Sequence, residues 1–190
     1  QVPGISNVFS PEQNLDWSNV VRPRSSSLFS QINTDDGPKQ VWTTFGPDQI
    51  DLNWHNPKMN LEFLNLIITY LSNGIKWFRL DAVGFIWKES GTTCLHLPKA
   101  HSIVKILRVL LNNLLDDGVL ITETNVPQKE NLSYLIPEDE AHMAYNFPLP
   151  PLLLEAIITS RADILNSWIF DWPTLPEDTT LFNFTASHDG

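Results

Sequence analysis

Three short apolar runs each end in an acidic residue, and this pattern limits the fold more than any other feature of the chain. The runs end at Asp81, two residues after Arg79, at Glu123, and at Asp189, directly after His188. Side chains alternate along a strand, so Arg79 and Asp81 are expected on one face. A guanidinium beside a carboxylate favours the ionised acid, and we therefore expect Asp81 to stay charged. Three strands that each deliver an acid at the carboxyl end are typical of a β/α barrel enzyme.

Helical and strand patterns alternate along most of the sequence. Helices are predicted near residues 58–72, 98–114, 128–136, 149–160 and 161–170, and strands near residues 75–81, 119–123, 141–147 and 180–185. Such alternation implies a parallel sheet with right-handed crossovers. An open doubly wound sheet would normally carry a glycine-rich phosphate-binding turn after a strand, and the sequence has none. The sequence therefore favours an α/β fold built on a closed barrel.

The first 45 residues differ from the rest of the chain. They are rich in proline and serine and sustain no helical period, so we expect loops there with at most two short strands. Whole β/α barrels need ~250 residues. This chain has 190 residues and begins at Gln1. We therefore expect it to be an internal segment of a longer protein.

The composition excludes several classes of partner. A net charge of -10, from 22 acidic residues and 12 Lys and Arg residues, argues against nucleic acid. No apolar stretch approaches the ~20 residues of a membrane span. The single cysteine, Cys94, excludes an internal disulfide framework and favours a reducing compartment, the cytoplasm. Histidines without i, i+4 pairing and the lack of a clustered carboxylate loop predict no metal site.

Four stretches, at residues 49–53, 77–82, 121–123 and 184–189, follow one another in the order of known signature motifs. They resemble the motifs of the α-amylase family of retaining glycosidases, glycoside hydrolase family 13. The resemblance implies a partial (β/α)8 TIM barrel with about strands 4–7 of the family. Residues 46–190 would belong to the barrel and residues 1–45 to part of an inserted, loop-rich domain B.

Five further stretches narrow this resemblance. They lie at residues 22–24, 41–45, 81–85, 88–92 and 145–153, and they resemble the sucrose phosphorylase branch of the family. Members of that branch transfer a glucosyl unit from a small glucoside to inorganic phosphate. Sucrose phosphorylases tend to carry Glu-Val-His at the acid/base motif. Here Glu123-Thr124-Asn125 resembles relatives that act on glucosylglycerate or on phosphorylated sucrose, so the donor stays open.

The resemblance implies a role for each of the three acids. Asp81 would be the nucleophile, Glu123 the general acid/base and Asp189 the stabiliser of the transition state. Retaining enzymes place the first two carboxyl groups ~5 Å apart. Glu123 has Thr124 and Asn125 as neighbours and no cation nearby in the sequence. We therefore expect Glu123 to be protonated near neutral pH.

Four other residues are candidate substrate contacts. Arg79 is expected to orient Asp81, and His188 to hold a sugar hydroxyl next to Asp189. Arg24 is a candidate for bidentate contacts with phosphate or the acceptor, and an ordinary exposed loop arginine is the alternative. Gln49 either contacts the substrate or only shapes the return of the insert to the barrel.

Three functions stay open, and none of them uses a cofactor. The favoured one is a retaining α-glucosyl phosphorylase that cleaves sucrose or a related small α-glucoside. Inorganic phosphate would be the co-substrate and α-glucose 1-phosphate the product, through a covalent glucosyl-enzyme. The second is an α-glucosidase or transglycosylase of the same family, and the third is a non-catalytic carbohydrate-binding remnant. The sequence also leaves a homodimer open.

Overall fold

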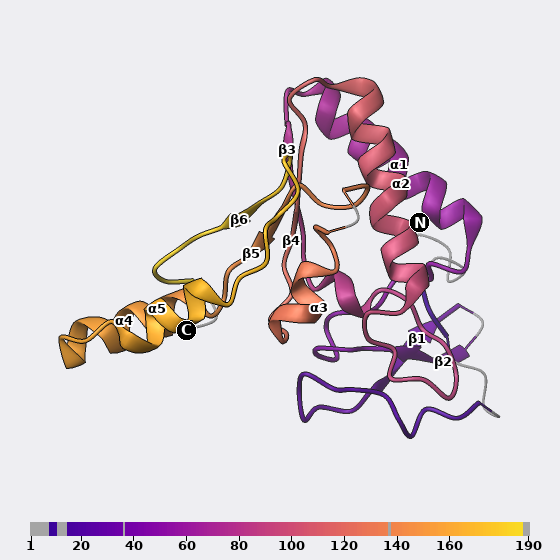
Figure 1. The fold of residues 1–190 in the computed structure, drawn as a ribbon. Helices are drawn as coiled ribbons and strands as arrows, with labels where there is room; N and C mark the ends of the chain where they lie inside the picture. The colour runs from indigo at the N-terminus through magenta and orange to yellow at the C-terminus, as the bar shows by residue number, and fades with distance from the viewer. Residues whose placement is uncertain (1–7, 11–14, 36, 137, 188–190) are drawn as a thin grey trace. The chain divides into compact units, whose positions relative to one another are not determined.

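The chain forms two compact units in a computed structural model, and Figure 1 labels their helices and strands. The model describes residues 8–10, 15–35, 37–136 and 138–187. The first unit comprises residues 1–75 and 82–103, and the second unit comprises residues 76–81 and 104–190. The short segment that ends at Asp81 therefore belongs to the second unit, although first-unit residues precede and follow it.

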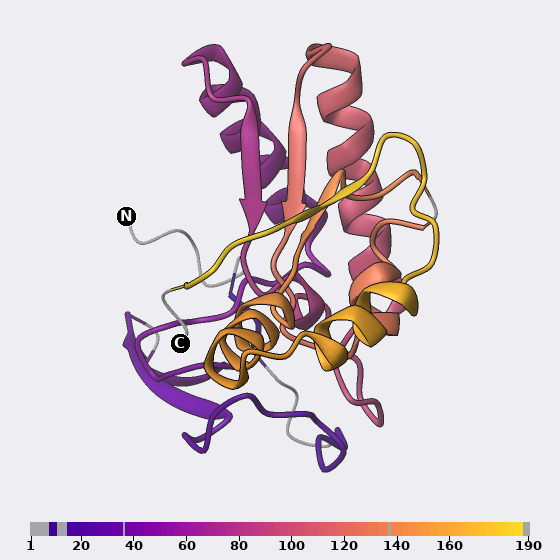
Figure 2. The same ribbon diagram turned by 60° about the vertical axis from the view of Figure 1, so that its left-hand side comes forward.

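A parallel sheet forms the centre of the second unit. Its described strands, in order across the sheet, are β3 (Trp77–Leu80), β4 (Val119–Thr122), β5 (Met143–Tyr145) and β6 (Thr180–Phe182). Every neighbouring pair is parallel, and Figure 2 shows β3 and β4 side by side with the same direction. Because parallel strands end at a common edge, the residues that follow β3 and β4 are brought together there.

Helices occupy the connections between these strands. α2 (Pro98–Leu114) precedes β4, α3 (Gln128–Leu132) precedes β5, and α4 (Leu149–Thr159) and α5 (Asp163–Phe170) precede β6. The last two helices contact each other (Figure 1). Both expose large apolar side chains: Leu154, Ile157, Ile158, Ile164, Ile169 and Phe170.

The first unit combines a hairpin with a helix. The strands β1 (Phe29–Thr34) and β2 (Gly37–Trp42) pair antiparallel, and α1 (Pro57–Ser72) follows. Proline suits the first turn of α1, and the Asn56 side chain caps the helix by accepting a hydrogen bond from the Lys58 N–H at 3.0 Å. Trp42 is 1% exposed, and the rings of Phe9, Trp17 and Phe29 pack edge-on against it.

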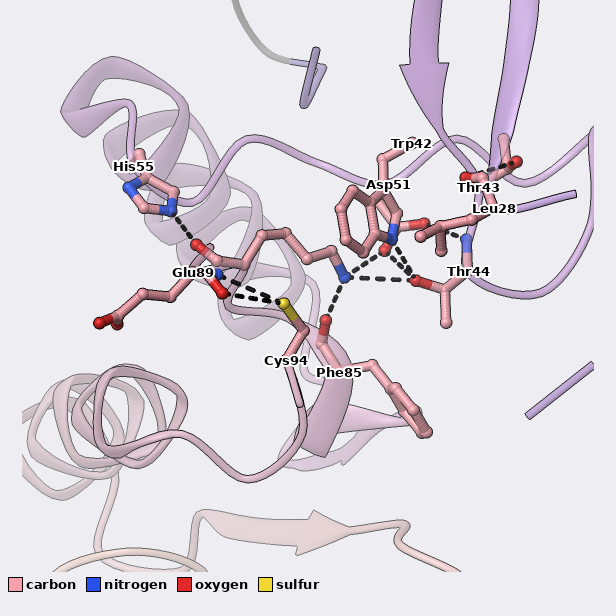
Figure 3. Close-up of polar contacts among 10 residues, drawn as sticks. Leu28, Trp42, Thr43, Thr44, Asp51, His55, Phe85, Glu89 and Cys94 are labelled. Carbon is pink, nitrogen blue, oxygen red and sulfur yellow. Dashed lines mark hydrogen bonds and ion pairs between the residues drawn. The ribbon is translucent and has the colours of Figure 1, made fainter. Parts of the chain in front are cut away.

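A buried lysine ties the loops of the first unit together. The ammonium group of Lys88 pairs with Asp51 Oδ2 at 2.6 Å, and it donates to Thr44 Oγ1 at 3.3 Å and to the Phe85 carbonyl oxygen. Figure 3 labels Asp51, Thr44 and Phe85, which supply these oxygens, and marks the polar contacts among them with dashed lines. The side chain of Lys88 is 2% exposed. Burial lowers the pKa of Lys88, and the charge of Asp51 opposes this effect. Asp51 lies in a predicted family motif, and its contacts here stabilise the loops.

The predicted α/β arrangement with parallel strands is confirmed, and each predicted helix and strand has an observed counterpart. Several observed elements are shorter than predicted: α3 ends at Leu132, β5 spans Met143–Tyr145 and β6 ends at Phe182. A short 3₁₀ turn at Val83–Phe85 was not predicted. Among the residues that the model describes, no helix has the length and apolar character needed to cross a membrane.

Candidate active site

Arg79 joins two of the three carboxylates that the sequence singled out. Its Nη2 lies 3.1 Å from Asp81 Oδ1 and also forms an ion pair with Glu123 Oε1. Strand register explains the meeting, because Leu80 pairs with Thr122 and each acid directly follows the last residue of its strand. The Glu123 N–H continues the ladder by donating to the Leu80 carbonyl oxygen at 3.1 Å. The structure therefore brings Arg79, Asp81 and Glu123 together within the second unit.

Burial distinguishes the two carboxylates. The side chain of Asp81 is 72% exposed, whereas that of Glu123 is 7% exposed. Burial raises the pKa of Glu123, and a hydrogen bond with Asp81 raises it further, while Arg79 acts in the opposite direction. A buried carboxyl group with a raised pKa is what a general acid requires near neutral pH.

The structure adds a contact to Glu123 that its sequence neighbours do not reveal. Its sequence neighbours include no cation, yet Arg79 contacts its carboxylate directly. In the parallel pairing of β3 with β4, Arg79 lies opposite Ile121, so Glu123 is its diagonal neighbour. Only the register of the two strands reveals this contact. Burial disfavours the charge of Arg79, but the hydrogen bond and charge of Glu123, with that of Asp81, raise the pKa of the guanidinium overall. Arg79 therefore stays cationic between the two acids.

The backbone turns sharply directly after Asp81. Ala82 has φ 45° and ψ 37°, the left-handed region that a residue with a side chain rarely adopts. The conformation costs about 1 kcal/mol. A hydrogen bond from the Phe85 N–H to the Ala82 carbonyl oxygen at 3.0 Å closes the following turn. The chain thus leaves the sheet immediately after Asp81 instead of extending the strand past it.

Sequence reasoning missed the residues that support the site from within the second unit. Thr124 donates its hydroxyl to Asn131 Oδ1 at 2.7 Å, and Asn131 Nδ2 donates to the Tyr145 carbonyl oxygen at 2.9 Å. The Arg79 guanidinium lies over the Tyr145 ring, with its carbon 5.5 Å from the ring centroid. The signal available in the sequence was weak, since Thr124 and Asn131 are ordinary polar residues in a loop and a short helix.

The other predicted site residues belong either to the first unit or to the residues outside the described ranges. Arg24 and Gln49 are exposed residues of the first unit. His188 and Asp189 lie outside the described residues. Within the part of the chain that the model describes, no group of three His, Cys, Asp or Glu side chains is placed to hold a metal ion.

Paired carboxylates beside a cation, at the carboxyl edge of a parallel α/β sheet, are characteristic of enzymes that work by acid–base and nucleophilic chemistry. A comparison with known protein families makes the assignment specific. The family model for the alpha amylase catalytic domain matches residues 32–184, and the chain belongs to the alpha-amylase family.

Individual relatives are similar over nearly the whole chain. The chain is 44% identical to the glucosylglycerate phosphorylase of Escherichia coli K12 over 193 residues, which covers 100% of this chain and 34% of that protein. It is 48% identical to the glucosylglycerate phosphorylase of Allomeiothermus silvanus over 180 residues, 94% of this chain and 32% of that protein. The chain therefore spans about a third of the length of these relatives.

A solved structure supports the fold. The crystal structure of sucrose 6F-phosphate phosphorylase from Thermoanaerobacter thermosaccharolyticum superposes with a TM-score of 0.73 at 23% sequence identity. The match covers 86% of this chain and 34% of that one. At this identity the likeness establishes the shared fold.

Proposed function

We propose that the chain is the central catalytic segment of a retaining α-glucosyl phosphorylase whose donor is glucosylglycerate or a closely related small α-glucoside. The observation that carries the proposal is the Arg79-bridged pair of Asp81 and the buried Glu123. The 44% and 48% identity to two glucosylglycerate phosphorylases supports this donor. The motif Glu123-Thr124-Asn125, which is not the Glu-Val-His typical of sucrose phosphorylases, points the same way.

The two carboxyl groups divide the chemistry between them. Protonated Glu123 donates its proton to the glycosidic oxygen while the Asp81 carboxylate attacks the anomeric carbon, which gives a covalent glucosyl-enzyme. Arg79 keeps Asp81 ionised for that attack. Glu123, now a carboxylate, takes the proton from phosphate as a phosphate oxygen attacks the same carbon from the face that the leaving group vacated. Two inversions retain the α configuration and release α-glucose 1-phosphate.

The other predicted contacts complete the proposal. Asp189 would stabilise the oxocarbenium-like transition state through ring hydroxyls, and His188 would hold a neighbouring hydroxyl. Arg24 would contact phosphate through its guanidinium, since planar forks bind oxyanions in a bidentate manner. Gln49 would contact the substrate from the motif at residues 49–53. The partners are thus a small α-glucoside and phosphate, with no metal or organic cofactor.

The finer architecture is also a proposal. We infer part of a (β/α)8 barrel, with strands β3 to β6 as about strands 4–7 of the family, residues 46–190 in the barrel and residues 1–45 in part of domain B. Four parallel strands in sequence order with helical connections support this arrangement. The apolar side chains exposed on α4 and α5 support a longer protein in which further chain covers them.

The experiment is a donor screen on the full-length protein. Glucosylglycerate, sucrose and sucrose 6′-phosphate are each supplied with and without phosphate, and α-glucose 1-phosphate is measured against free glucose. Phosphate-dependent α-glucose 1-phosphate from glucosylglycerate is the expected result. Free glucose at a rate that ignores phosphate would show a hydrolase instead. Saturable sugar binding without product from any donor would show a carbohydrate-binding protein.

A further inference from the structure

Two buried polar side chains connect the residue after Glu123 to the neighbouring strand. The Thr124 hydroxyl donates to Asn131 Oδ1 at 2.7 Å, and Asn131 Nδ2 donates to the Tyr145 carbonyl oxygen at 2.9 Å. Thr124 is 5% exposed and Asn131 is 4% exposed. We call this arrangement the Thr124–Asn131–Tyr145 chain, and all of it lies within the second unit.

Both ends of this chain lead to the candidate active site. At one end Thr124 directly follows Glu123, whose N–H is fixed by the Leu80 carbonyl oxygen at 3.1 Å. At the other end the guanidinium of Arg79 lies over the Tyr145 ring, with the guanidinium carbon 5.5 Å from the ring centroid. Arg79 in turn pairs with Glu123. The Thr124–Asn131–Tyr145 chain therefore completes a closed circuit of contacts around Glu123, the proposed general acid/base, and Arg79.

Asparagine is the side chain that suits the middle of this arrangement. Its amide oxygen accepts from Thr124 and its amide nitrogen donates to Tyr145, so both halves of the group are used in opposite senses. An aspartate could accept but not donate, and a leucine could do neither. The residue is also anchored through its own N–H, which donates to the Pro127 carbonyl oxygen at 3.1 Å at the start of α3.

We propose that Asn131, acting through Thr124, is a positioning residue that keeps Glu123 in its buried setting and holds Tyr145 beneath Arg79. The inference rests on the role of Glu123 as general acid/base in the proposed function. Loss of the hydrogen bonds in the Thr124–Asn131–Tyr145 chain would let the segment after β4 move outward, and water would then reach the Glu123 carboxyl group. A hydrated carboxyl group gives up its proton at lower pH, so acid assistance to the leaving group would weaken.

The test uses an isosteric change in the full-length protein. Thr124→Val removes the hydroxyl and keeps the shape, while Thr124→Ser keeps the hydroxyl. Thr179→Val is the matched control, because Thr179 is a buried threonine at the opposite end of the sheet whose hydroxyl also donates to a carbonyl, that of Pro176 at 2.9 Å. Each variant is assayed with glucosylglycerate, which needs acid help, and with α-glucosyl fluoride, which needs little.

Thr124→Val should lower kcat/KM at least about tenfold on glucosylglycerate and less than about threefold on glucosyl fluoride, because acid catalysis contributes ~10²–10⁴-fold to poor leaving groups alone. The alkaline limb of the pH profile should move to lower pH, and Thr124→Ser should restore it. Thr179→Val should change the melting temperature without moving that limb. Equal losses of kcat/KM on both donors, with an unmoved alkaline limb of the pH profile, would overturn the proposal. The Thr124–Asn131–Tyr145 chain would then have a structural role alone.

A second measurement separates this inference from the proposed function. Carbon-13 NMR titration of labelled glutamate side chains follows Glu123 without any turnover, and Glu123→Gln identifies its signal. Thr124→Val should lower the pKa of Glu123 whether the protein is a phosphorylase, a hydrolase or neither. An unchanged pKa would refute the positioning role even if the donor screen succeeded. A failed donor screen with a lowered pKa would refute only the proposed activity.

Discussion

Each unit of the molecule contains a basic side chain that pairs with one or two carboxylates, and the two clusters differ in how far they are buried. In the first unit, Lys88 is 2% exposed and its partner Asp51 is 16% exposed. In the second unit, Arg79 is 34% exposed and touches two acids, one buried and one open to solvent. The Lys88–Asp51 pair is enclosed by protein, whereas the Arg79 cluster presents an exposed carboxylate to solvent.

The difference shows which pair is suited to chemistry. Three protein oxygens contact the Lys88 ammonium group, namely Asp51 Oδ2, Thr44 Oγ1 and the Phe85 carbonyl oxygen, and both oxygens of Asp51 also accept hydrogen bonds from Thr44. Such a closed pair resists the loss of either member but offers nothing to a substrate. The Arg79 cluster leaves one acid exposed beside the guanidinium and the other buried with a raised pKa. Two acids with opposite settings are the basis of acid/base assignments in enzymes.

The largest effect is expected from Asp81→Asn in the full-length protein. Glucosyl transfer should fall ~10⁴-fold or more, because the amide cannot act as the nucleophile. The fold should be nearly unchanged, since the side chain is 72% exposed and the substitution conserves volume. Single-turnover transfer and thermal melting measure the two quantities.

Asp51→Asn is the matched control for this comparison. It makes the same chemical change in the closed pair and leaves the Lys88 ammonium group buried without its carboxylate. The melting temperature should drop while the folded fraction still turns over. If Asp81→Asn kept wild-type rates, or if Asp51→Asn abolished turnover without any loss of stability, the assignment of the two pairs would be reversed.

The next effect is expected from Glu123→Gln. Transfer from glucosylglycerate should fall ~10²–10⁴-fold, because the amide cannot protonate the leaving oxygen. α-Glucosyl fluoride should still form the glucosyl-enzyme at near wild-type rate, since fluoride leaves with little assistance. The ratio of the two rates measures the acid role directly, and a ratio equal to that of the wild type would contradict it.

Lys88→Met should act on stability alone. The thioether fills a similar volume but leaves Asp51 without its buried cation, which should cost about 3 kcal/mol. Denaturant unfolding of the full-length protein measures this loss. Adding Asp51→Leu to Lys88→Met should recover most of it, because a well-packed apolar pair can replace a buried ion pair. A double variant as unstable as the single one would show that the loops need the charge itself.

The contrast also shows what the sequence could and could not predict. Arg79 and Asp81 lie two residues apart, so strand alternation alone was enough to place them on one face. The helix predicted near residues 58–72 is observed as α1, Pro57–Ser72. The ion pair of Arg79 with Glu123 joins residues far apart in sequence, and it depended on the register of β3 against β4. The Lys88–Asp51 pair and the Thr124–Asn131 bond depend likewise on contacts between segments that no local pattern encodes.

The smallest effect expected is a difference in pH dependence between the two clusters. In the proposed mechanism activity requires protonated Glu123, so its raised pKa should move the alkaline loss of kcat/KM to higher pH than an ordinary glutamate would allow. For Lys88 the pKa is lowered from 10.5, so the native state binds fewer protons than the unfolded state between the lowered value and 10.5. Stability from this group therefore rises with pH across that window. The gap in unfolding free energy between wild type and Lys88→Met should widen towards pH 10.5 while kcat/KM falls. A gap that narrows instead would show that Asp51 outweighs burial and holds Lys88 charged in the native state.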